Sequence, residues 1–198
     1  MKQLILASQS PRRKMLLKQI GVSFQTYPSD IDEAITGNEE AEDYVRFLSE
    51  RKALSVKEHL CSNGCNSFVV LAADTIVVLD GVILGKPADE SHAFDMLKKL
   101  SGNWHEVITG VSVIDGDEEK KLTHVETTLV KIRELTSGEI RRYIETKEPL
   151  DKAGAYGIQG IGALLVERIN GCYYNVVGLP LYSVSVMLSQ FGIKTILG

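Results

Sequence analysis

The sequence predicts an α/β protein built on a mixed, twisted β-sheet with flanking helices. Short apolar runs typical of strands alternate along the 198 residues with longer segments whose apolar residues recur at helical spacing. Asp80-Gly81 lies between two apolar runs, which is a strong signal for a two-residue hairpin, and Asp115-Gly116 is a second. Because hairpins join antiparallel neighbours, we expect a mixed sheet rather than a purely parallel one.

Local signals justify the individual elements in turn. Ser10 suits a helix N-cap with Pro11 in the favoured first position, and Thr136 with Glu139 reads as a capping box. The expected strands are 3–7, 23–27, 68–73, 75–79, 82–84, 107–114, 123–132, 164–169 and 173–177. The expected helices are 11–20, 40–60, 91–100, 137–146 and 181–190.

Composition and charge limit the classes of function. Apolar residues make up 44% of the chain and charged residues 24%, which is ordinary for a globular protein with a real core. The length suits one large domain or two small lobes, and no linker is obvious, so residues 1–198 are expected to form a single domain with intimately joined lobes. A net charge of −4 argues against nucleic acid as a partner, so any anion binding must be local.

Cysteine usage and hydropathy indicate the compartment. No apolar run approaches the roughly 20 residues of a membrane span, and the charged, strand-like start does not resemble a signal peptide. The three cysteines fit reduced thiols in a cytosol, so we expect a cytoplasmic protein without a membrane partner. His59, Cys61 and Cys65 supply only three zinc ligands, at a spacing that matches no standard zinc pattern. The alternative is a helix end followed by a polar turn.

The start of the first expected helix carries the wrong charge. Arg12, Arg13 and Lys14 follow Pro11 at the positive pole of the helix, where each cation costs about 0.3–1 kcal/mol. Free backbone N–H groups and guanidinium groups at this place would suit a polyphosphate, and Ser8 and Ser10 could add hydroxyl donors. The alternative is a solvated basic turn that tolerates a small penalty.

Two charged side chains fall at positions expected to be apolar. Asp74 interrupts the run from Phe68 to Leu79, which favours a metal ligand or general base over the alternative, an Asp at a strand end that caps a bend. Lys52 lies on the inward stripe of the second helix, between Leu48 and Val56. Its stem could pack while its ammonium reaches water, or it could point into a cleft.

Three further groups are weaker signals. Gly85-Lys86-Pro87 is no P-loop, because its glycine spacing is wrong and Pro87 stands where Ser or Thr should be, but Lys86 could be a fixed charge for phosphate. Asp30, Asp32 and Glu33 form an acidic loop that could hold magnesium or simply be solvated. The glycines around Gln159 allow close approach to a flat ligand, and this amide could read the edge of a base.

Five ordered motifs together resemble the Maf family of nucleoside triphosphate pyrophosphatases. They are Ser8-Gln-Ser-Pro-Arg-Arg13, Ala73-Asp-Thr-Ile-Val77, Gly85-Lys-Pro87, Ala153-Gly-Ala-Tyr-Gly-Ile-Gln-Gly160 and Val176-Val-Gly-Leu-Pro180. The resemblance runs from near residue 4 to about residue 190. It implies a fold with two lobes around a central cleft, like that of the inosine-triphosphate pyrophosphatases, and hydrolysis of a nucleoside triphosphate to the monophosphate and pyrophosphate.

The resemblance also implies roles for individual residues. The sequence at Asp74-Thr75 and around Gln159 is similar to the branch of the family that acts on dTTP and UTP. Asp74 is then the proton acceptor, and Arg12, Thr75 and Gln159 set the substrate specificity. Phosphate-handling positions match Ser8, Arg13, Lys52 and Lys86, and Glu33 with Asp74 would bind a divalent cation, Mg²⁺ or Mn²⁺.

The family implies house-cleaning of the nucleotide pool, a homodimer and a link to septum formation. Two other functions stay open at this point. A non-catalytic nucleotide sensor that regulates cell division would need neither Asp74 nor a metal. A purine-directed house-cleaning pyrophosphatase would prefer nucleotides such as inosine triphosphate.

Overall fold

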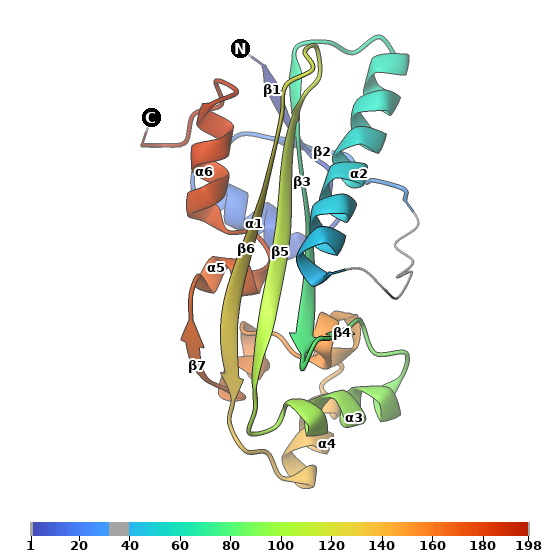
Figure 1. The fold of residues 1–198 in the computed structure, drawn as a ribbon, viewed down its shortest axis with the longest axis vertical. Helices are drawn as coiled ribbons and strands as arrows, with labels where there is room; N and C mark the ends of the chain where they lie inside the picture. Colours follow the sequence, from blue (N-terminus) through green and yellow to red (C-terminus); the bar gives the residue numbers. More distant parts are fainter. Residues whose placement is uncertain (1, 32–39, 198) are drawn as a thin grey trace. The chain divides into compact units, whose positions relative to one another are not determined.

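The computed structural model describes residues 2–31 and 40–197, and it confirms the α/β class (Figure 1). In the described part of the chain, the strands are β1 (Gln3–Leu6), β2 (Gln25–Thr26), β3 (Phe68–Leu79), β4 (Val82–Leu84), β5 (Trp104–Asp115), β6 (Lys121–Ile132) and β7 (Val166–Asn170). The α-helices are α1 (Pro11–Gln19), α2 (Ala41–Ser62), α3 (Glu90–Leu100), α4 (Ser137–Glu145), α5 (Tyr173–Val177) and α6 (Leu181–Ser189). Three 3₁₀ turns are η1 (Glu148–Asp151), η2 (Ala153–Ala155) and η3 (Gly160–Leu164).

The sheet is mixed, as the hairpin signals predict. Its strand order is β2-β1-β3-β5-β6-β7, with β4 paired to β3 beside this path. β1 runs parallel to β2 and β3, whereas β4 is antiparallel to β3 and β7 is antiparallel to β6. The β3–β4 hairpin turns at Asp80 and Gly81, whose φ angles of 50° and 76° are those that a tight hairpin of this kind requires.

The chain divides into two compact units. The first unit comprises residues 1–74, 109–126 and 178–198, and the second comprises 75–108 and 127–177. Each unit has its own apolar core, because the first contains Val70 and Ala72 packed with Ala53 and Val56, and the second contains the cluster between α3, α4 and the strands. Among the described residues, none of the helices combines the length and the apolar character that crossing a membrane requires.

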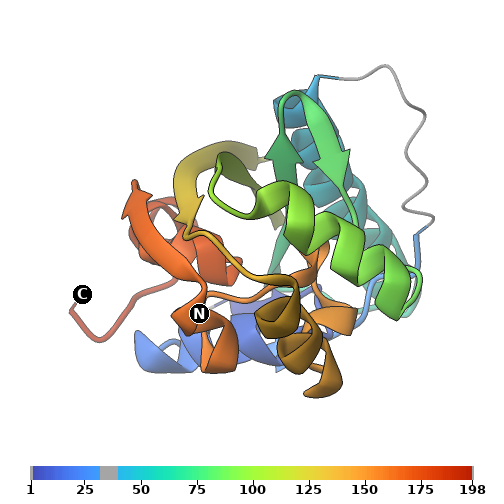
Figure 2. The ribbon, with the colours of Figure 1, turned by 90° about the horizontal axis from the view of Figure 1, so that it is seen from below.

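In the first unit, α1 and α2 cover opposite faces of the strands (Figures 1 and 2). α1 connects β1 to β2, and α2 leads back across β1 to β3, so two right-handed crossovers in opposite directions place the helices on opposite faces. α2 approaches β5 very closely, since a Cβ atom added to Gly110 would lie 2.3 Å from the carbonyl oxygen of Val45. Ser49 Oγ of α2 and Ser112 Oγ of β5 are 2.9 Å apart.

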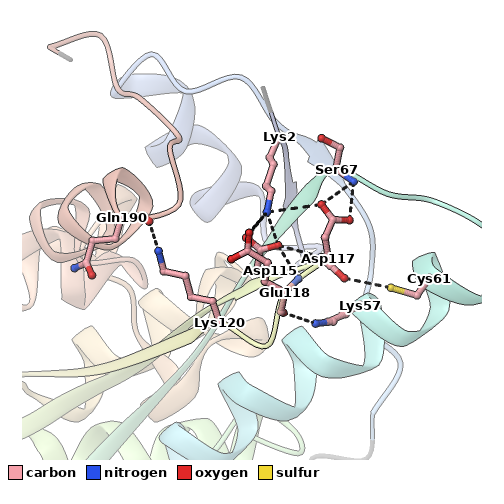
Figure 3. Close-up of polar contacts among 10 residues, drawn as sticks. Lys2, Lys57, Cys61, Ser67, Asp115, Asp117, Glu118, Lys120 and Gln190 are labelled. Atoms are coloured by element: carbon pink, nitrogen blue, oxygen red, sulfur yellow. Dashed lines mark hydrogen bonds and ion pairs between the residues drawn. The ribbon is translucent and has the colours of Figure 1, made fainter.

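At the amino ends of β1 and β3, the first unit is tied together by a polar network (Figure 3). Lys2 Nζ lies 2.7 Å from both carboxylate oxygens of Asp115. Asp117 accepts from the backbone N–H of Ser67 at 2.9 Å, and Lys57 Nζ donates to the carbonyl oxygen of Glu118 at 3.0 Å. These contacts fix the turn between β5 and β6.

Two predictions, one about a hairpin turn and one about a strand, are wrong. The Asp115-Gly116 signal predicts a two-residue turn, but the backbone N–H of Asp115 bonds to the carbonyl oxygen of Lys120, and the Asp115 carboxylate accepts from the N–H groups of Asp117 and Glu118. A side chain that caps its own following backbone therefore stabilises a longer turn. The break expected between residues 73 and 75 is also absent, because β3 is one continuous strand.

The strand expected at 173–177 is a helix, α5. Its aromatic and β-branched residues favour a strand, but Asn175 is fully buried. The Asn175 amide donates to the carbonyl oxygen of Val107 and to Thr128 Oγ1, both at 3.0 Å. This tertiary anchoring outweighs the local preference. The other expected elements are present with ends that differ by a few residues, and the capping box of Thr136 and Glu139 is confirmed.

Candidate active site

The carboxyl end of β1 and the neighbouring middle of β3 form the candidate site of the first unit. β1 lies between β2 and β3, and all three strands are parallel. The connection from β1 to β2 and the connection from β2 back across β1 to β3 run in opposite directions. Open α/β sheets bind ligands beyond the carboxyl ends of the strands at such a switch point. Leu6 is in register with Leu71, and the N–H of Ala7 bonds to the carbonyl oxygen of Leu71 at 2.8 Å. Ser8 therefore follows the end of β1, and Asp74 lies in the middle of β3, three residues after Leu71.

The start of α1 is built around Ser10 and Arg13. Ser10 is the N-cap, as predicted, and its hydroxyl accepts from the N–H of Arg13 at 3.5 Å. Arg13 Nε donates to the carbonyl oxygen of Gly178 at 2.8 Å, and Arg13 Nη1 lies 3.5 Å from Ser8 Oγ. The first turn of α1 contains no acidic residue. Sequence reasoning missed the contact with Gly178, which lies 165 positions away within one of the five family motifs.

Lys52 and Asp74 form a buried ion pair. Lys52 Nζ lies 2.6 Å from Asp74 Oδ1, and the two side chains are only 9% and 11% exposed. Lys52 does not extend its ammonium to water, and Asp74 does not cap a bend, because it lies inside β3. Two charges removed from water need close pairing to be tolerated, and this geometry supplies it. The proton-acceptor and metal-binding roles of Asp74 stay predictions.

Thr75 follows Asp74 on β3 and points to the other face of the strand. It shares that face with Val77, and a Cβ atom added to Gly154 would lie 3.0 Å from Val77 Cγ1. Thr75 is therefore on the side of β3 that meets the Gly154 segment within the second unit. Asp74 shares its face with Ala72, which packs with Ala53 and Val56 of α2.

Lys86 and Gln159 both belong to the second unit. Lys86 is exposed in the loop after β4, and Gln159 is partly buried directly before η3. The N–H of Gly154 donates to the carbonyl oxygen of Gly85 at 3.0 Å, so the Gly85–Pro87 turn and the motif that carries Gln159 are in contact. Phosphate binding by Lys86 and base selection by Gln159 stay predictions.

A buried polar pair anchors the same motif. Tyr156 Oη lies 2.7 Å from His105 Nε2, and both side chains are almost completely buried. Burial lowers the pKa of His105 to about 4, so the imidazole is neutral at pH 7. Sequence reasoning missed this pair, because a histidine in a strand carries no signal of its partner.

Of the metal site predicted at Glu33 and Asp74, the structure describes Asp74, whereas Glu33 and the neighbouring Asp32 lie outside the described residues. Within residues 2–31 and 40–197, no cluster of three or more His, Cys, Asp or Glu side chains could hold a metal ion. A single carboxylate such as Asp74 nevertheless fits magnesium, which is commonly held by one or two carboxylates plus the phosphates of a substrate.

The segment considered for zinc is a helix end. α2 ends at Ser62, and Asn63 and Gly64 form the polar turn after it, with Gly64 at φ 76°. The His59 ring lies 5.0 Å from the Tyr27 ring, and Cys61 Sγ donates to the carbonyl oxygen of Gly116 at 3.6 Å. These contacts support the alternative to zinc.

Comparisons with known proteins decide the family. The sequence model described as Maf-like protein matches residues 3–191. The chain belongs to the Maf family. This Maf chain is 54% identical over 192 residues to a dTTP/UTP pyrophosphatase of Caldicellulosiruptor bescii, covering 97% of the chain and 96% of that protein. It is 51% identical over 198 residues to a dTTP/UTP pyrophosphatase of Acetivibrio thermocellus, with 99% and 98% covered.

Proposed function

We propose that this Maf protein hydrolyses dTTP and UTP to the monophosphate and pyrophosphate. Two full-length relatives that bear this activity in their names share about half of its residues. The observation that supports it most is the buried pair of Lys52 and Asp74, because it holds a carboxylate at the switch point beside a helix start that carries Arg12 and Arg13. Cations beside a fixed carboxylate suit the hydrolysis of a phosphoanhydride.

In the proposed reaction, Asp74 takes the proton of a water molecule as this water attacks the α-phosphorus. The bond from the α-phosphorus to the bridging oxygen breaks, and pyrophosphate leaves. Lys52 holds the Asp74 carboxylate at 2.6 Å and so fixes its direction. Phosphate oxygens would be bound by Ser8, Arg12, Arg13, Lys52 and Lys86.

A divalent cation, Mg²⁺ or Mn²⁺, is part of the proposal. Glu33 and Asp74 would hold it together with phosphate oxygens of the substrate. When bound, it would neutralise phosphate charge and lower the pKa of the attacking water.

The base would be selected by Thr75 and Gln159, with Arg12 as a third specificity residue. Gln159 offers both a donor and an acceptor, which a pyrimidine base edge can match. We further propose a cytoplasmic, homodimeric enzyme that cleans the nucleotide pool, with a connection to septum formation.

The direct test is pyrophosphate release by the purified protein from dTTP, UTP, dCTP, CTP and inosine triphosphate. We expect dTTP and UTP to be preferred, and activity to disappear with a chelator and return with added Mg²⁺ or Mn²⁺. A preference for inosine triphosphate would favour the purine-directed alternative. Tight binding of dTTP without turnover in either metal would favour the nucleotide sensor.

A further inference from the structure

In the second unit, Glu148 and Tyr143 together bind both ends of the segment that carries Gln159. Glu148, the first residue of η1, accepts from the backbone N–H of Ile161 at 3.0 Å and from that of Gly162 at 2.9 Å. It also accepts from the hydroxyl of Tyr143 at 2.9 Å. The same hydroxyl accepts from the N–H of Gly157 at 3.3 Å. Residues 157 and 162 are thus tied to one pair of side chains, and Gln159 lies between them.

The glycines of the 157–162 segment show how closely its backbone packs against Glu148 and Tyr143. Gly160 has a φ of +67°, and a Cβ atom added to it would lie 2.6 Å from Glu148 Oε2. A Cβ atom on Gly162 would lie 2.2 Å from the carbonyl oxygen of Gly157 and 2.5 Å from Tyr143 Oη. Only glycine fits at these places, so the path of the backbone past Glu148 is closely fixed.

The charge states agree with this geometry. Burial raises the pKa of Glu148, but the hydrogen bonds from Gly162, Ile161 and Tyr143 outweigh it, and the pKa is lowered overall. The pKa of Tyr143 is raised by burial and by its hydrogen bond to Glu148. At neutral pH, therefore, a carboxylate that can only accept faces three donors, and the phenol keeps its proton.

We propose that Glu148, with Tyr143 behind it, is a positioning residue for base selection: it holds the 157–162 backbone so that the Gln159 amide meets the pyrimidine at a fixed angle. This inference rests on the proposed function. Neither side chain needs to touch the nucleotide. A bond network that only stabilised the fold would affect all nucleotides equally, whereas one that positions Gln159 affects the preference between bases.

The test compares Glu148→Gln with the wild type in kcat/KM for dTTP and for dCTP, which share the same sugar. Glu148→Gln replaces one carboxylate oxygen with an NH₂ group, which would face the backbone N–H of Ile161 or Gly162. Two donors cannot form a hydrogen bond, so the 157–162 segment must shift. We expect the ratio of the dTTP value to the dCTP value to fall on the order of tenfold, because small misplacements near a reacting ligand have large effects. A ratio within about twofold of the wild type would overturn the inference.

Glu139→Gln is the matched control in the same unit. Glu139 also accepts from a backbone N–H, that of Thr136 at 2.8 Å, and from a side chain, Arg133 Nη2 at 2.8 Å, but none of its hydrogen bonds is to the 157–162 segment. We expect Glu139→Gln to lower the melting temperature without changing the base preference. A change of preference as large as that in Glu148→Gln would show a general effect of destabilisation and overturn the inference.

Tyr143→Phe tests the same positioning role if Glu148→Gln does not fold. It removes one hydroxyl, and with it the contacts to Glu148 and Gly157. A smaller fall in the same ratio supports the inference, and an unchanged ratio overturns it. The wild-type assay separates the two proposals, because a wild type that prefers dTTP over dCTP keeps the proposed function even if the variants leave that preference unchanged.

Discussion

Lys52 and Asp74 place opposite charges against each other almost out of contact with water. We predict that Lys52→Met lowers the free energy of unfolding by about 3 kcal/mol or more, because it leaves a buried carboxylate without its ammonium. The double variant with Asp74→Asn should lose less than the sum of the single losses, by about 1 kcal/mol or more, in urea denaturation. Additive losses would show that the two side chains do not interact.

An exposed pair provides the control for this cycle. Lys121 Nζ lies 3.1 Å from Glu50 Oε2, and the Lys121 side chain is 56% exposed. Lys121→Met should cost less than about 1 kcal/mol, since water already screens that pair.

His105 makes stability depend on pH. Its pKa is about 4 in the folded protein and about 6.5 unfolded, so the unfolded chain binds more protons between these values and the stability falls as the pH is lowered. We predict that His105→Gln removes about 2 kcal/mol of the loss in unfolding free energy between pH 7 and pH 5. Urea denaturation at both pH values measures it, and an equal pH dependence in the wild type and the variant would be inconsistent with a neutral buried imidazole.

At the scale of residues, the sequence identified charged side chains at positions where apolar residues are expected. It did not identify polar side chains at positions where polar residues are common. Asp74 and Lys52 stand out because the positions around them are apolar. Glu148 and His105 do not stand out, since a glutamate in a polar turn is ordinary and a strand position says nothing about a partner far along the chain. The resemblance supplied Gln159, but not the side chains that hold its segment.

At the scale of elements, the contact between α2 and β5 depends on one missing side chain. We predict that Gly110→Ala lowers the free energy of unfolding by about 1–3 kcal/mol, because its Cβ would lie 2.3 Å from the backbone oxygen of Val45 and force the helix away. Gly85→Ala is the control, since a Cβ atom there meets nothing within 4 Å. Equal melting temperatures for the two variants would contradict this account of the packing.

Element positions followed from the sequence where local signals and burial agree. The caps at Ser10 and Thr136 and the Asp80-Gly81 turn act through neighbouring residues, so they are readable locally. The helix α5 could not be predicted locally, because its conformation depends on the burial of Asn175 against Val107 and Thr128. The turn after β5 was longer than predicted because its backbone is capped by Asp115.

At the scale of the whole molecule, the first unit separates a stabilising network from the candidate site. Lys2 directly precedes β1, and Asp115 ends β5 next to the start of β3. Ser8 follows the other end of β1, and Asp74 lies beyond the residues of β3 that pair with β1. We predict that Asp115→Asn lowers the free energy of unfolding by about 2 kcal/mol, through weaker bonds to Lys2 and the turn, and leaves kcat/KM for dTTP unchanged. A loss of kcat/KM in a fully folded variant would contradict this separation.

The fold class and the family were readable from the sequence because they depend on repeated patterns and five ordered motifs. The boundary between the two compact units was not readable from the sequence, since no linker marks it: it falls inside β3 between Asp74 and Thr75. Strands that continue from one compact unit into the next leave no change of composition at the boundary.

The chemistry assigned to Asp74 is the central claim, and turnover of dTTP by Asp74→Asn tests it most directly. The account predicts that pyrophosphate release falls by at least about a hundredfold, because the general base is lost, while calorimetry with Mg²⁺ shows dTTP binding close to that of the wild type. A folded Asp74→Asn protein that releases pyrophosphate at the wild-type rate would contradict it.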